Sequence, residues 1–240
     1  MTRRIVALVP ARSGSKRILN KNLRLLSGIP LIAWTIRSAR ESARITDVIV
    51  STESGVIAEE AKRYGARIPF MRPENLSTDT ASTDDVIMHA VAELDLQDDD
   101  ILMLLQPTSP LRTAASMDKA LELLENNAYE GVVSVTECEH SPLWVNVLPD
   151  DLTMGDFISD SISSTRSQDL PSYYRLNGAI YAYKVRFLRE HKRRRYTKQI
   201  RAFVMPLRES VDIDSPADFE YAEFLSASID RKARNASCNR

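Results

Sequence analysis

Cysteine and long apolar runs are scarce in this sequence. Its 240 residues include two cysteines, Cys138 and Cys238, which are far apart and lack the spacing of metal ligands. This usage predicts a reducing, cytoplasmic location without a disulfide framework. No stretch approaches the roughly 18 consecutive apolar residues of a membrane span, and the first residues do not form a signal-peptide pattern. We therefore expect no membrane segment.

An excess of charge of one sign is also missing. The formal net charge is -1, so we expect no nucleic-acid partner, and any anion site must be local. Hydrophobic residues make up 43% and charged residues 27% of the chain, which is typical of globular proteins. The length suits one large α/β domain with a small appendage.

Two familiar phosphate-binding motifs are absent, yet a basic loop lies near the N-terminus. Neither G-x-x-x-x-G-K-[ST] nor G-x-G-x-x-G occurs. Instead, an apolar run of strand length at 5–9 ends at Pro10, and the small residues at 13–15 let backbone amides approach a ligand. Four cations surround this backbone: Arg12, Lys16, Arg17 and Lys21. Amides and cations together suit a polyphosphate, although a solvated basic turn explains the same pattern.

Strands and helices alternate through the first half of the chain. Apolar runs predict strands near residues 5–9, 46–51, 66–70 and 101–105. Helical spacing and capping residues predict helices near residues 30–42, 55–64, 84–94 and 117–124. This alternation indicates a parallel sheet covered by helices on both faces. Ligands bind beyond the carboxyl ends of such strands, so the basic loop and the loops at 72–82 and 106–112 should converge on one crevice.

The pattern changes after a strand at residues 131–135. Residues 138–175 contain two short apolar stretches and no clear helix, which predicts an inserted or projecting β arm. The sheet should resume at residues 177–181 and end with a strand at 201–205.

A final helix and a polar tail close the chain. Ser215 caps the predicted helix, with Asp218 reaching back as in a capping box. We interpret the basic run at 191–195 as a solvated loop in preference to a binding patch. Residues 1–228 are then expected to form a single domain, and 229–240 a frayed tail.

Two acidic residues near the C-terminus, Asp212 and Asp214, are separated by one residue. In an extended segment their side chains point the same way, and neighbouring carboxylates repel each other unless a cation lies between them. Mg²⁺ is commonly bound by one or two carboxylates together with phosphate oxygens. The same pattern is compatible with a turn followed by a helix cap. The basic loop elsewhere in the chain favours the metal interpretation.

Several short motifs follow one another in a specific order. They are Pro10-Ala11-Arg12-x-x-Ser15-Lys16 with Lys21-Asn22, Val50-Ser51-Thr52, Arg72-Pro73, Asp79-Thr80-Ala81-Ser82, Gln106-Pro107-Thr108-Ser109-Pro110-Leu111-Arg112, Arg175-x-Asn177-Gly178-Ala179-Ile180-Tyr181 and Asp212-Ile213-Asp214. Each is weak alone, but the ordered set is specific. Over about residues 4–226 the chain resembles the acylneuraminate cytidylyltransferases, also called CMP-sialic acid synthetases.

This resemblance implies an α/β, Rossmann-like nucleotidyltransferase fold and a homodimer in which the arm at 138–175 packs against the partner subunit. It implies that CTP reacts with a 2-keto-3-deoxy sugar acid to give the CMP-sugar acid and pyrophosphate. The stretch at 106–112 favours the sialic or legionaminic type. Leu19 stands where family members usually carry proline, which removes a backbone restraint but leaves the cations in place.

The resemblance also implies roles for individual residues. The triphosphate would be held by Arg12, Lys16 and Lys21. The cytidine contacts would come from Asn22, Arg72 and Ser82 with the backbone around Ala11. The sugar-acid side would be formed by Gln106, Arg175, Asn177 and Tyr181, with Arg166 and Gln168 as additional contacts. Mg²⁺, for which Mn²⁺ can substitute, would be held by Asp212 and Asp214.

Other functions remain open alongside this one. A related enzyme that activates Kdo or pseudaminic acid is the first, although the Kdo type usually lacks the Gly-Ser-Lys and Lys-Asn pattern seen here. A non-catalytic nucleotide-binding module on the same fold is the second; loss of the acidic pair or the cations would favour it, and both are intact. His89 and His140 lie in a helix pattern and in the arm, so neither is expected to act as general base.

Overall fold

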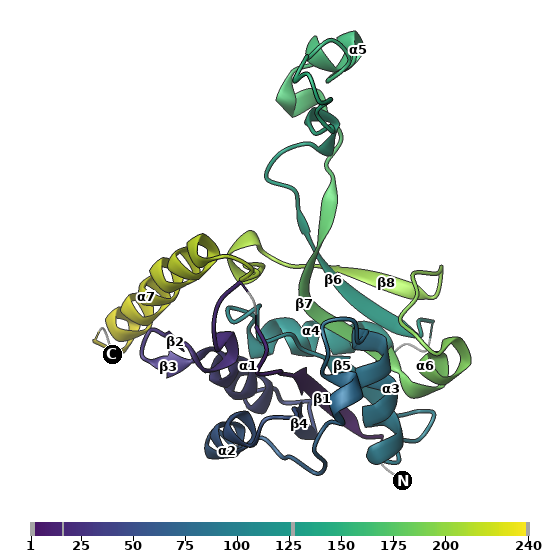
Figure 1. Ribbon diagram of the computed structural model, residues 1–240, viewed down its shortest axis with the longest axis vertical. Coiled ribbons are helices and arrows are strands. Elements are labelled where there is room, and N and C mark those ends of the chain that lie inside the picture. The colour runs from purple at the N-terminus through teal and green to yellow at the C-terminus, as the bar shows by residue number, and fades with distance from the viewer. Residues whose placement is uncertain (1–2, 16, 126–127, 239–240) are drawn as a thin grey trace.

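The central sheet has the alternating topology expected from the sequence. The computed structural model describes residues 3–15, 17–125 and 128–238, with side chains up to residue 227. Its six-stranded sheet has the order β4-β1-β5-β7-β6-β8 (Figure 1). The strands are β1 (Ile5–Pro10), β4 (Asp47–Ser51), β5 (Ile101–Leu104), β6 (Gly131–Glu137), β7 (Tyr174–Lys184) and β8 (Ile200–Val204). Only β7 runs antiparallel to its neighbours, which confirms a mostly parallel sheet among the described strands.

Helices cover both faces of this sheet. One face carries α1 (Leu31–Arg40), α2 (Gly55–Arg63) and α4 (Ala114–Glu125), and the other carries α3 (Thr83–Glu93) and α6 (Val185–His191). Alternate residues of β1 enter opposite cores, because successive side chains of a strand point to opposite faces. Ala7 and Val9 pack under α1, whereas Val6 and Leu8 pack under α3. Burial on both sides explains why β1 and β5 are continuous apolar runs.

A third, smaller core lies beside the sheet. Here α7 (Pro216–Cys238) packs against the hairpin formed by β2 (Leu25–Leu26) and β3 (Ile29–Pro30). Ile18 of the basic loop and Ile213 of the acidic segment are buried in the same core. The fold therefore joins the two charged segments of the sequence through apolar packing. No helix in the described part of the chain is long and apolar enough to cross a membrane.

The predicted caps at Ser54 and Ser215 are confirmed, and Ser82, which was not predicted as a cap, caps α3 in the same way. The hydroxyls of Ser54 and Ser82 accept hydrogen bonds from the third residue of α2 and α3, Ile57 and Asp85. Ser215 precedes α7, and the Asp218 carboxylate accepts hydrogen bonds from the Ser215 amide at 2.7 Å and its hydroxyl at 2.8 Å. Such caps satisfy amides that have no partner inside the helix. The backbone of α7 continues through the predicted tail as far as Cys238.

One prediction of secondary structure is wrong, and one helix was not predicted. Residues 66–70 form no strand, because only Arg67 makes an isolated bridge, to Ile49, before Pro69 removes the next available amide. The helix α6 was not expected, since its seven residues are too few to show a clear period before the basic run begins. Short helical turns also occur at η1 (Lys21–Leu23), η2 (Glu74–Leu76) and η5 (Leu207–Glu209).

The arm projects from the sheet as expected, but its outer part is not β-structure. Antiparallel pairing of Thr136 with Arg175 and of Glu137 with Tyr174 forms its stem. Beyond the stem the chain forms helical turns: η3 (Pro142–Trp144), α5 (Asp160–Ser163) and η4 (Ser167–Asp169). In Figure 1 this part stands away from the rest of the molecule, with α5 at its far end.

Candidate active site

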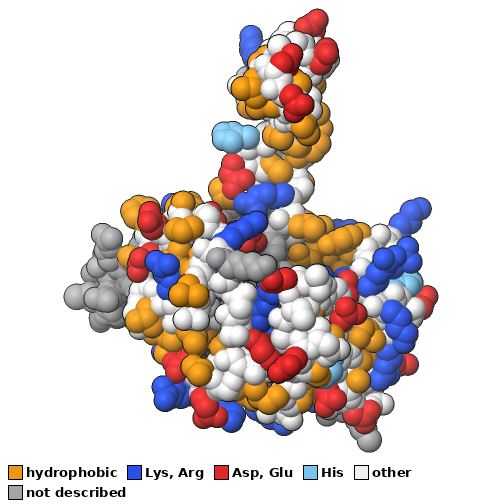
Figure 2. Space-filling model, in the orientation of Figure 1, with side chains coloured by type: hydrophobic (Ala, Val, Ile, Leu, Met, Phe, Trp, Pro, Cys, Tyr) orange, Lys and Arg blue, Asp and Glu red, His pale blue; other side chains and the backbone are white. Residues whose placement is uncertain are grey.

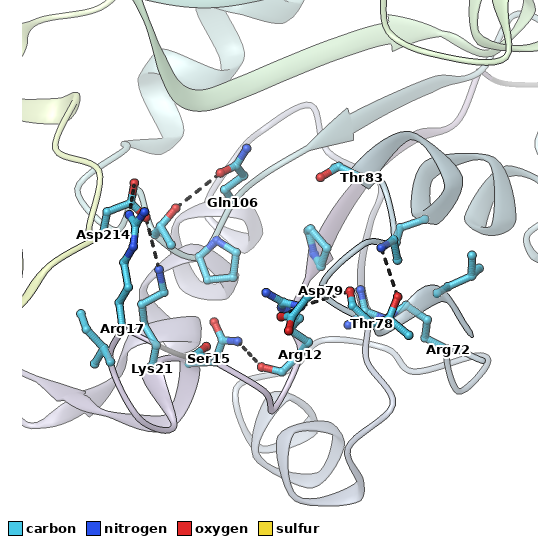
Figure 3. Close-up of a pocket in the computed structure, with 18 residues that line it drawn as sticks. Arg12, Ser15, Arg17, Lys21, Arg72, Thr78, Asp79, Thr83, Gln106 and Asp214 are labelled. Carbon is cyan, nitrogen blue, oxygen red and sulfur yellow. Dashed lines mark hydrogen bonds and ion pairs between the residues drawn. The ribbon is translucent and has the colours of Figure 1, made fainter. Parts of the chain in front are cut away.

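A cavity of about 520 Å³ opens beyond the carboxyl ends of β1 and β5 (Figure 3). The basic loop, the loop around residues 72–81 and the loop that follows β5 meet there, as the sheet topology predicts. Its polar and charged lining consists of Arg12, Ser15, Arg17, Lys21, Asn22, Arg72, Thr78, Asp79, Thr83, Gln106, Thr108 and Asp214. Positive groups dominate this lining, so the cavity suits an anionic ligand.

The backbone of the basic loop is fixed by side chains from three other segments. Arg72 donates hydrogen bonds to the Ala11 carbonyl and to Glu53, both at 3.0 Å. Asn22 donates to the Arg12 carbonyl at 2.9 Å. Glu53 also accepts from the Ser13 amide at 2.7 Å and from its hydroxyl at 2.8 Å. The loop is therefore preorganised without the proline that Leu19 replaces.

Glu53 is a site residue that the sequence motifs did not reveal. Burial raises the pKa of its carboxyl, but hydrogen bonds from Ser13 and Arg72 outweigh this effect and hold the pKa below its ordinary value. The carboxylate is therefore charged at neutral pH and balances Arg72, which is itself almost fully buried. Its position just beyond β4, at a strand's carboxyl end, is the signal that would have pointed to it.

The cations of the cavity already contact partners within the chain. Arg12 donates from Nη1 to Asp79 Oδ1 at 2.8 Å and to the Thr78 carbonyl at 3.1 Å. Lys21 Nζ donates to the Ile213 carbonyl at 2.8 Å and lies 3.7 Å from Asp214 Oδ1. These contacts bridge the loops across the cavity mouth. The predicted site residue Lys16 lies outside the described residues.

The acidic pair lies on the short segment between η5 and α7. Val211 and Ile213 are buried in the third core, so Asp212 and Asp214 project to the other side, as the period of an extended segment predicts. The Ile213 amide donates to the Thr108 carbonyl at 2.8 Å, which ties the segment to the loop after β5. Asp214 faces the cavity with 61% of its side chain exposed.

Asp212 is the more buried member of this pair. Burial raises the pKa of its carboxyl, a hydrogen bond from Thr108 opposes that change, and the nearby Asp214 raises the pKa further. Its Oδ1 is buried and has no hydrogen-bond partner in the structure. Gly178, at φ +73°, leaves room beside Oδ2: a Cβ there would come within 3.3 Å. An unsatisfied, partly buried carboxylate oxygen is costly, which is consistent with a site for a cation.

The donor set limits which cation the site suits. Among the described residues no group of three or more His, Cys, Asp or Glu side chains is arranged to hold a metal ion. Two carboxylates beside a cationic cavity fit Mg²⁺, because this ion is usually bound by one or two carboxylates and takes its other ligands from phosphate and water. They do not fit zinc, which prefers nitrogen and sulfur ligands.

Several predicted site residues lie outside the cavity lining. Ser82 is exposed as the cap of α3, between the lining residues Ala81 and Thr83. Ala11 is buried and contributes its carbonyl to Arg72. Arg166 and Gln168 are exposed on the arm. The arm residues are therefore not brought to the cavity within one chain.

The predicted residues of β7 occupy three different environments. Asn177 is buried and donates to Ser210 at 2.9 Å, which fixes the strand beside the acidic segment. Arg175 forms an ion pair of 2.9 Å with Glu139 at the base of the arm. Tyr181 is only 6% exposed, and the Arg194 guanidinium lies 5.0 Å from the centre of its ring. None of the three lines the cavity.

Comparisons with known proteins agree on one family. The model of a family described as cytidylyltransferase matches residues 6–233. The chain is 36% identical over 235 residues to CMP-N,N'-diacetyllegionaminic acid synthase of Legionella pneumophila, covering 92% of this chain and 96% of that protein. It is 37% identical over 224 residues to N-acylneuraminate cytidylyltransferase of Escherichia coli, and spans about half of it, 52%.

A solved structure shares the fold. It is that of CMP:2-keto-3-deoxy-manno-octonic acid synthetase complexed with CTP, with a TM-score of 0.70 over 94% of this chain and 99% of that one. The sequence identity is 20%, so this likeness establishes the α/β nucleotidyltransferase architecture and leaves the residues of the site to be argued from this chain.

Proposed function

This chain belongs to the cytidylyltransferase family, and we propose that it transfers CMP from CTP to the anomeric hydroxyl of a nonulosonic, sialic-type acid, releasing pyrophosphate. The observation that carries the proposal is one cavity of about 520 Å³ in which Arg12, Lys21, Gln106 and Asp214 face one another. It offers cations for a triphosphate, a carboxylate for a metal and an amide for a polar acceptor. The reaction takes place in the cytoplasm, in keeping with the sparse cysteines.

CTP binding exchanges internal partners for phosphate. Arg12 and Lys21 turn from Asp79 and the Ile213 carbonyl toward the triphosphate, with Lys16 as a further cation supplied by the loop. A triphosphate carries more negative charge than the single carboxylate and the carbonyl that it replaces, and an arginine can bind phosphate through two parallel hydrogen bonds, which favours the exchange. The cytidine lies against Asn22, Arg72 and Ser82 beside the Ala11 backbone.

Asp212 and Asp214 would hold Mg²⁺, or Mn²⁺ in its place. The cation, when bound, supplies Lewis-acid polarisation of phosphoryl oxygens. The fit rests on the unpartnered Oδ1 of Asp212 and on the exposure of Asp214 to the cavity. Lys21 Nζ lies 3.7 Å from Asp214 Oδ1, so the same ammonium group orients the carboxylate and neutralises phosphate charge.

The reaction is an in-line substitution at the α-phosphorus. The anomeric oxygen forms the new P–O bond and releases its proton to solvent, the bond to the β-phosphate breaks, and pyrophosphate leaves with its charge offset by Arg12 and Lys21. None of the chain's three histidines lines the cavity, and all three lie within the described residues. Positioning and charge neutralisation therefore account for most of the rate enhancement.

The acceptor lies on the side of the cavity marked by Gln106, the second residue after β5. Its side chain is close to Thr108, whose hydroxyl is 3.5 Å from Gln106 Oε1. Arg175 lies further out, at the base of the arm, whereas Tyr181 pairs with Leu104 at the end of β5, and Asn177 fixes the backbone of β7 between them. A sugar acid of nine carbons is long enough to extend from the α-phosphate toward these residues.

We propose a homodimer because one chain leaves a large apolar surface uncovered. Leu176, Val135 and Val204 are paired side by side across β7, β6 and β8, and Leu176 and Val204 are exposed. Figure 2 shows apolar side chains gathered at the foot of the arm and along it. On the arm itself Val145 and Val147 are 72% and 87% exposed. Patches of this kind usually mark interfaces.

In such a dimer the arm of one protomer completes the acceptor side of the other. Arg166 and Gln168 are exposed on the arm and have no route to the cavity of their own chain. In the dimer, these two polar side chains would contact the sugar acid that is bound in the cavity of the partner subunit. The homodimer and the shared acceptor site are thus one proposal, supported by the same exposed surface.

Pyrophosphate release tests the proposed function. The purified chain receives CTP, Mg²⁺ and, in parallel, N-acetylneuraminic, legionaminic and pseudaminic acids and Kdo, with UTP replacing CTP as control. Release with CTP and a nonulosonic acid is expected. Release with Kdo alone would assign the related activity, and CTP binding without release from any acid would favour the non-catalytic nucleotide-binding module.

A further inference from the structure

Arg112 is a buried cation that the proposed reaction does not yet use. Its side chain is fully enclosed, with 2% of the residue exposed, at the end of the loop that follows β5. No carboxylate of the described residues pairs with it. Burial lowers the pKa of Arg112 to about 9, so the guanidinium is still protonated at neutral pH. Burying a charge without a counterion costs several kcal/mol, so the position carries a cation at a penalty that an apolar side chain would avoid.

The guanidinium joins three elements of the fold. Nη1 donates to the Ala179 carbonyl of β7 at 2.7 Å, and Nη2 donates to the Thr35 hydroxyl of α1 at 2.8 Å. Both nitrogens also lie 3.4–3.5 Å from the Gln106 carbonyl. A planar fork with fixed donor directions can make this set of contacts, whereas a single ammonium group cannot.

Each of these contacts leads to the proposed acceptor side. Gln106 lines the cavity, and Ala179 follows Gly178, the residue packed against Asp212. The loop held by Arg112 also carries Thr108, whose carbonyl accepts from the Ile213 amide at 2.8 Å and whose hydroxyl bonds to Asp212. Both the acceptor amide and the acidic segment therefore rest on backbone that Arg112 fixes.

We propose that Arg112 is a positioning residue for the acceptor: its guanidinium sets the backbone of Gln106 and Thr108, and so aligns the sugar acid with the α-phosphorus. This inference rests on the proposed function. The cytidine and triphosphate contacts come from the basic loop and the 72–81 loop, which Arg112 does not touch. Its loss should therefore separate acceptor binding and turnover from CTP binding.

Arg112→Lys is the informative substitution, because it keeps the charge and removes the fork. Small misplacements of reacting groups cost on the order of a hundredfold in rate, so kcat should fall by about ten- to a hundredfold and the acceptor KM should rise. The Kd for CTP, measured by calorimetry, should change by less than about threefold. Arg44→Lys is the matched control, since Arg44 pairs with Glu122 and Glu125 far from the cavity.

A double substitution shows whether Arg112 acts through Gln106. If it does, adding Gln106→Ala to Arg112→Lys should raise the acceptor KM little beyond the single substitutions. Fully additive effects, an equal loss of CTP affinity, or unchanged kinetics in Arg112→Lys would each overturn the inference. A wild-type chain that binds CTP but turns over no acid would instead refute the proposed function on which the inference rests.

Discussion

The loops around the cavity and the arm differ in whether their side chains find partners within the same chain. Around the cavity, charged groups of the described residues have partners in the same chain: Arg72 has Glu53, Arg12 has Asp79 and Lys21 has the Ile213 carbonyl. Along the arm, by contrast, large apolar side chains such as Val145 and Val147 are exposed. Under the proposed function, one chain is thus sufficient to build the nucleotide side, whereas the acceptor side would need a second copy.

This difference separates two kinds of preorganisation. The internal partners of the cations act as stand-ins for phosphate, so the nucleotide side keeps its shape before CTP arrives. The arm cannot be preorganised in this way, because its large apolar side chains are left exposed by the described part of its own chain. Substitutions on the two sides should consequently affect different kinetic constants.

The largest effect is expected at the acidic segment that lies between the two sides. Asp212→Asn and Asp214→Asn should each lower kcat by about a hundredfold or more, because each removes a charged oxygen from the proposed metal site. Steady-state kinetics with Mg²⁺ and with Mn²⁺ measures this change. Asp99→Asn, at the opposite end of the sheet, is the control. Near-normal turnover in both variants would remove the metal assignment.

On the nucleotide side, Arg12→Ala should cost about 2–4 kcal/mol of transition-state stabilisation. The expected loss in kcat/KM for CTP is therefore roughly 30- to 1,000-fold. The acceptor KM should change far less, because Arg12 lies on the basic loop. Arg63→Ala, an exposed arginine of α2 paired with Glu60, serves as control. An unchanged kcat/KM for CTP would mean that Arg12 is not a phosphate ligand.

On the arm, introduced negative charges should prevent dimerisation without weakening nucleotide binding. Val145→Asp combined with Val147→Asp should yield a monomer by light scattering, because a carboxylate cannot be buried in an apolar interface. Loss of the partner's charged contacts should raise the acceptor KM by roughly 10- to 150-fold. CTP affinity should stay the same. Val56→Asp, on exposed α2, is the control, and a variant that remains dimeric and fully active would contradict the shared site.

Gln106→Ala should produce a smaller change, confined to the acceptor. Loss of one hydrogen bond costs about 0.5–1.5 kcal/mol, which corresponds to a rise of roughly 2- to 12-fold in the acceptor KM. Initial-rate measurements with each substrate varied in turn separate this from CTP binding. Gln97→Ala, distant from the cavity, is the control. A larger rise in the CTP KM would place the acceptor elsewhere.

The smallest expected effect is a gain in stability. The pKa of Asp212 is raised by burial, so its charged form destabilises the fold at pH values above that pKa. Asp212→Asn should therefore raise the Tm at pH 7. The gain should vanish as the pH falls through the raised pKa, because wild-type Asp212 is then neutral too. Thermal unfolding at pH 7 and pH 4 measures it, and an equal gain at both would exclude this cause.

Much of the nucleotide side follows from the sequence, because local patterns specify it. Continuous apolar runs gave β1 and β5, and the parallel topology brought the basic loop and Gln106 to one cavity. Glu53 could not be predicted as a site residue, because its role depends on a turn that places its carboxylate next to the Ser13 amide. Arg112 was identified only as part of the 106–112 motif, because its burial without a counterion depends on the three-dimensional packing.

The arm and its surroundings were harder to predict. Its apolar residues follow neither the helical nor the strand period. In the proposed dimer their spacing would match the surface of the partner subunit and not a core within the same chain. Tyr181 and Asn177 both lie in a sequence motif, but their contacts depend on the fold. The bulge of β7 around Gly178 determines the contacts of Asn177, and Arg194 packs over the ring of Tyr181. Such contacts join distant segments and leave no local signal.

The most direct test of the account follows the acceptor oxygen. A nonulosonic acid labelled with ¹⁸O at its anomeric hydroxyl is incubated with the enzyme, CTP and Mg²⁺, and the products are examined by ³¹P NMR and mass spectrometry. Attack of that oxygen on the α-phosphorus predicts that the label appears in the bridging oxygen of the CMP-sugar acid and that pyrophosphate carries none. Label in pyrophosphate, or an unlabelled CMP product, would contradict the reaction proposed for this cavity.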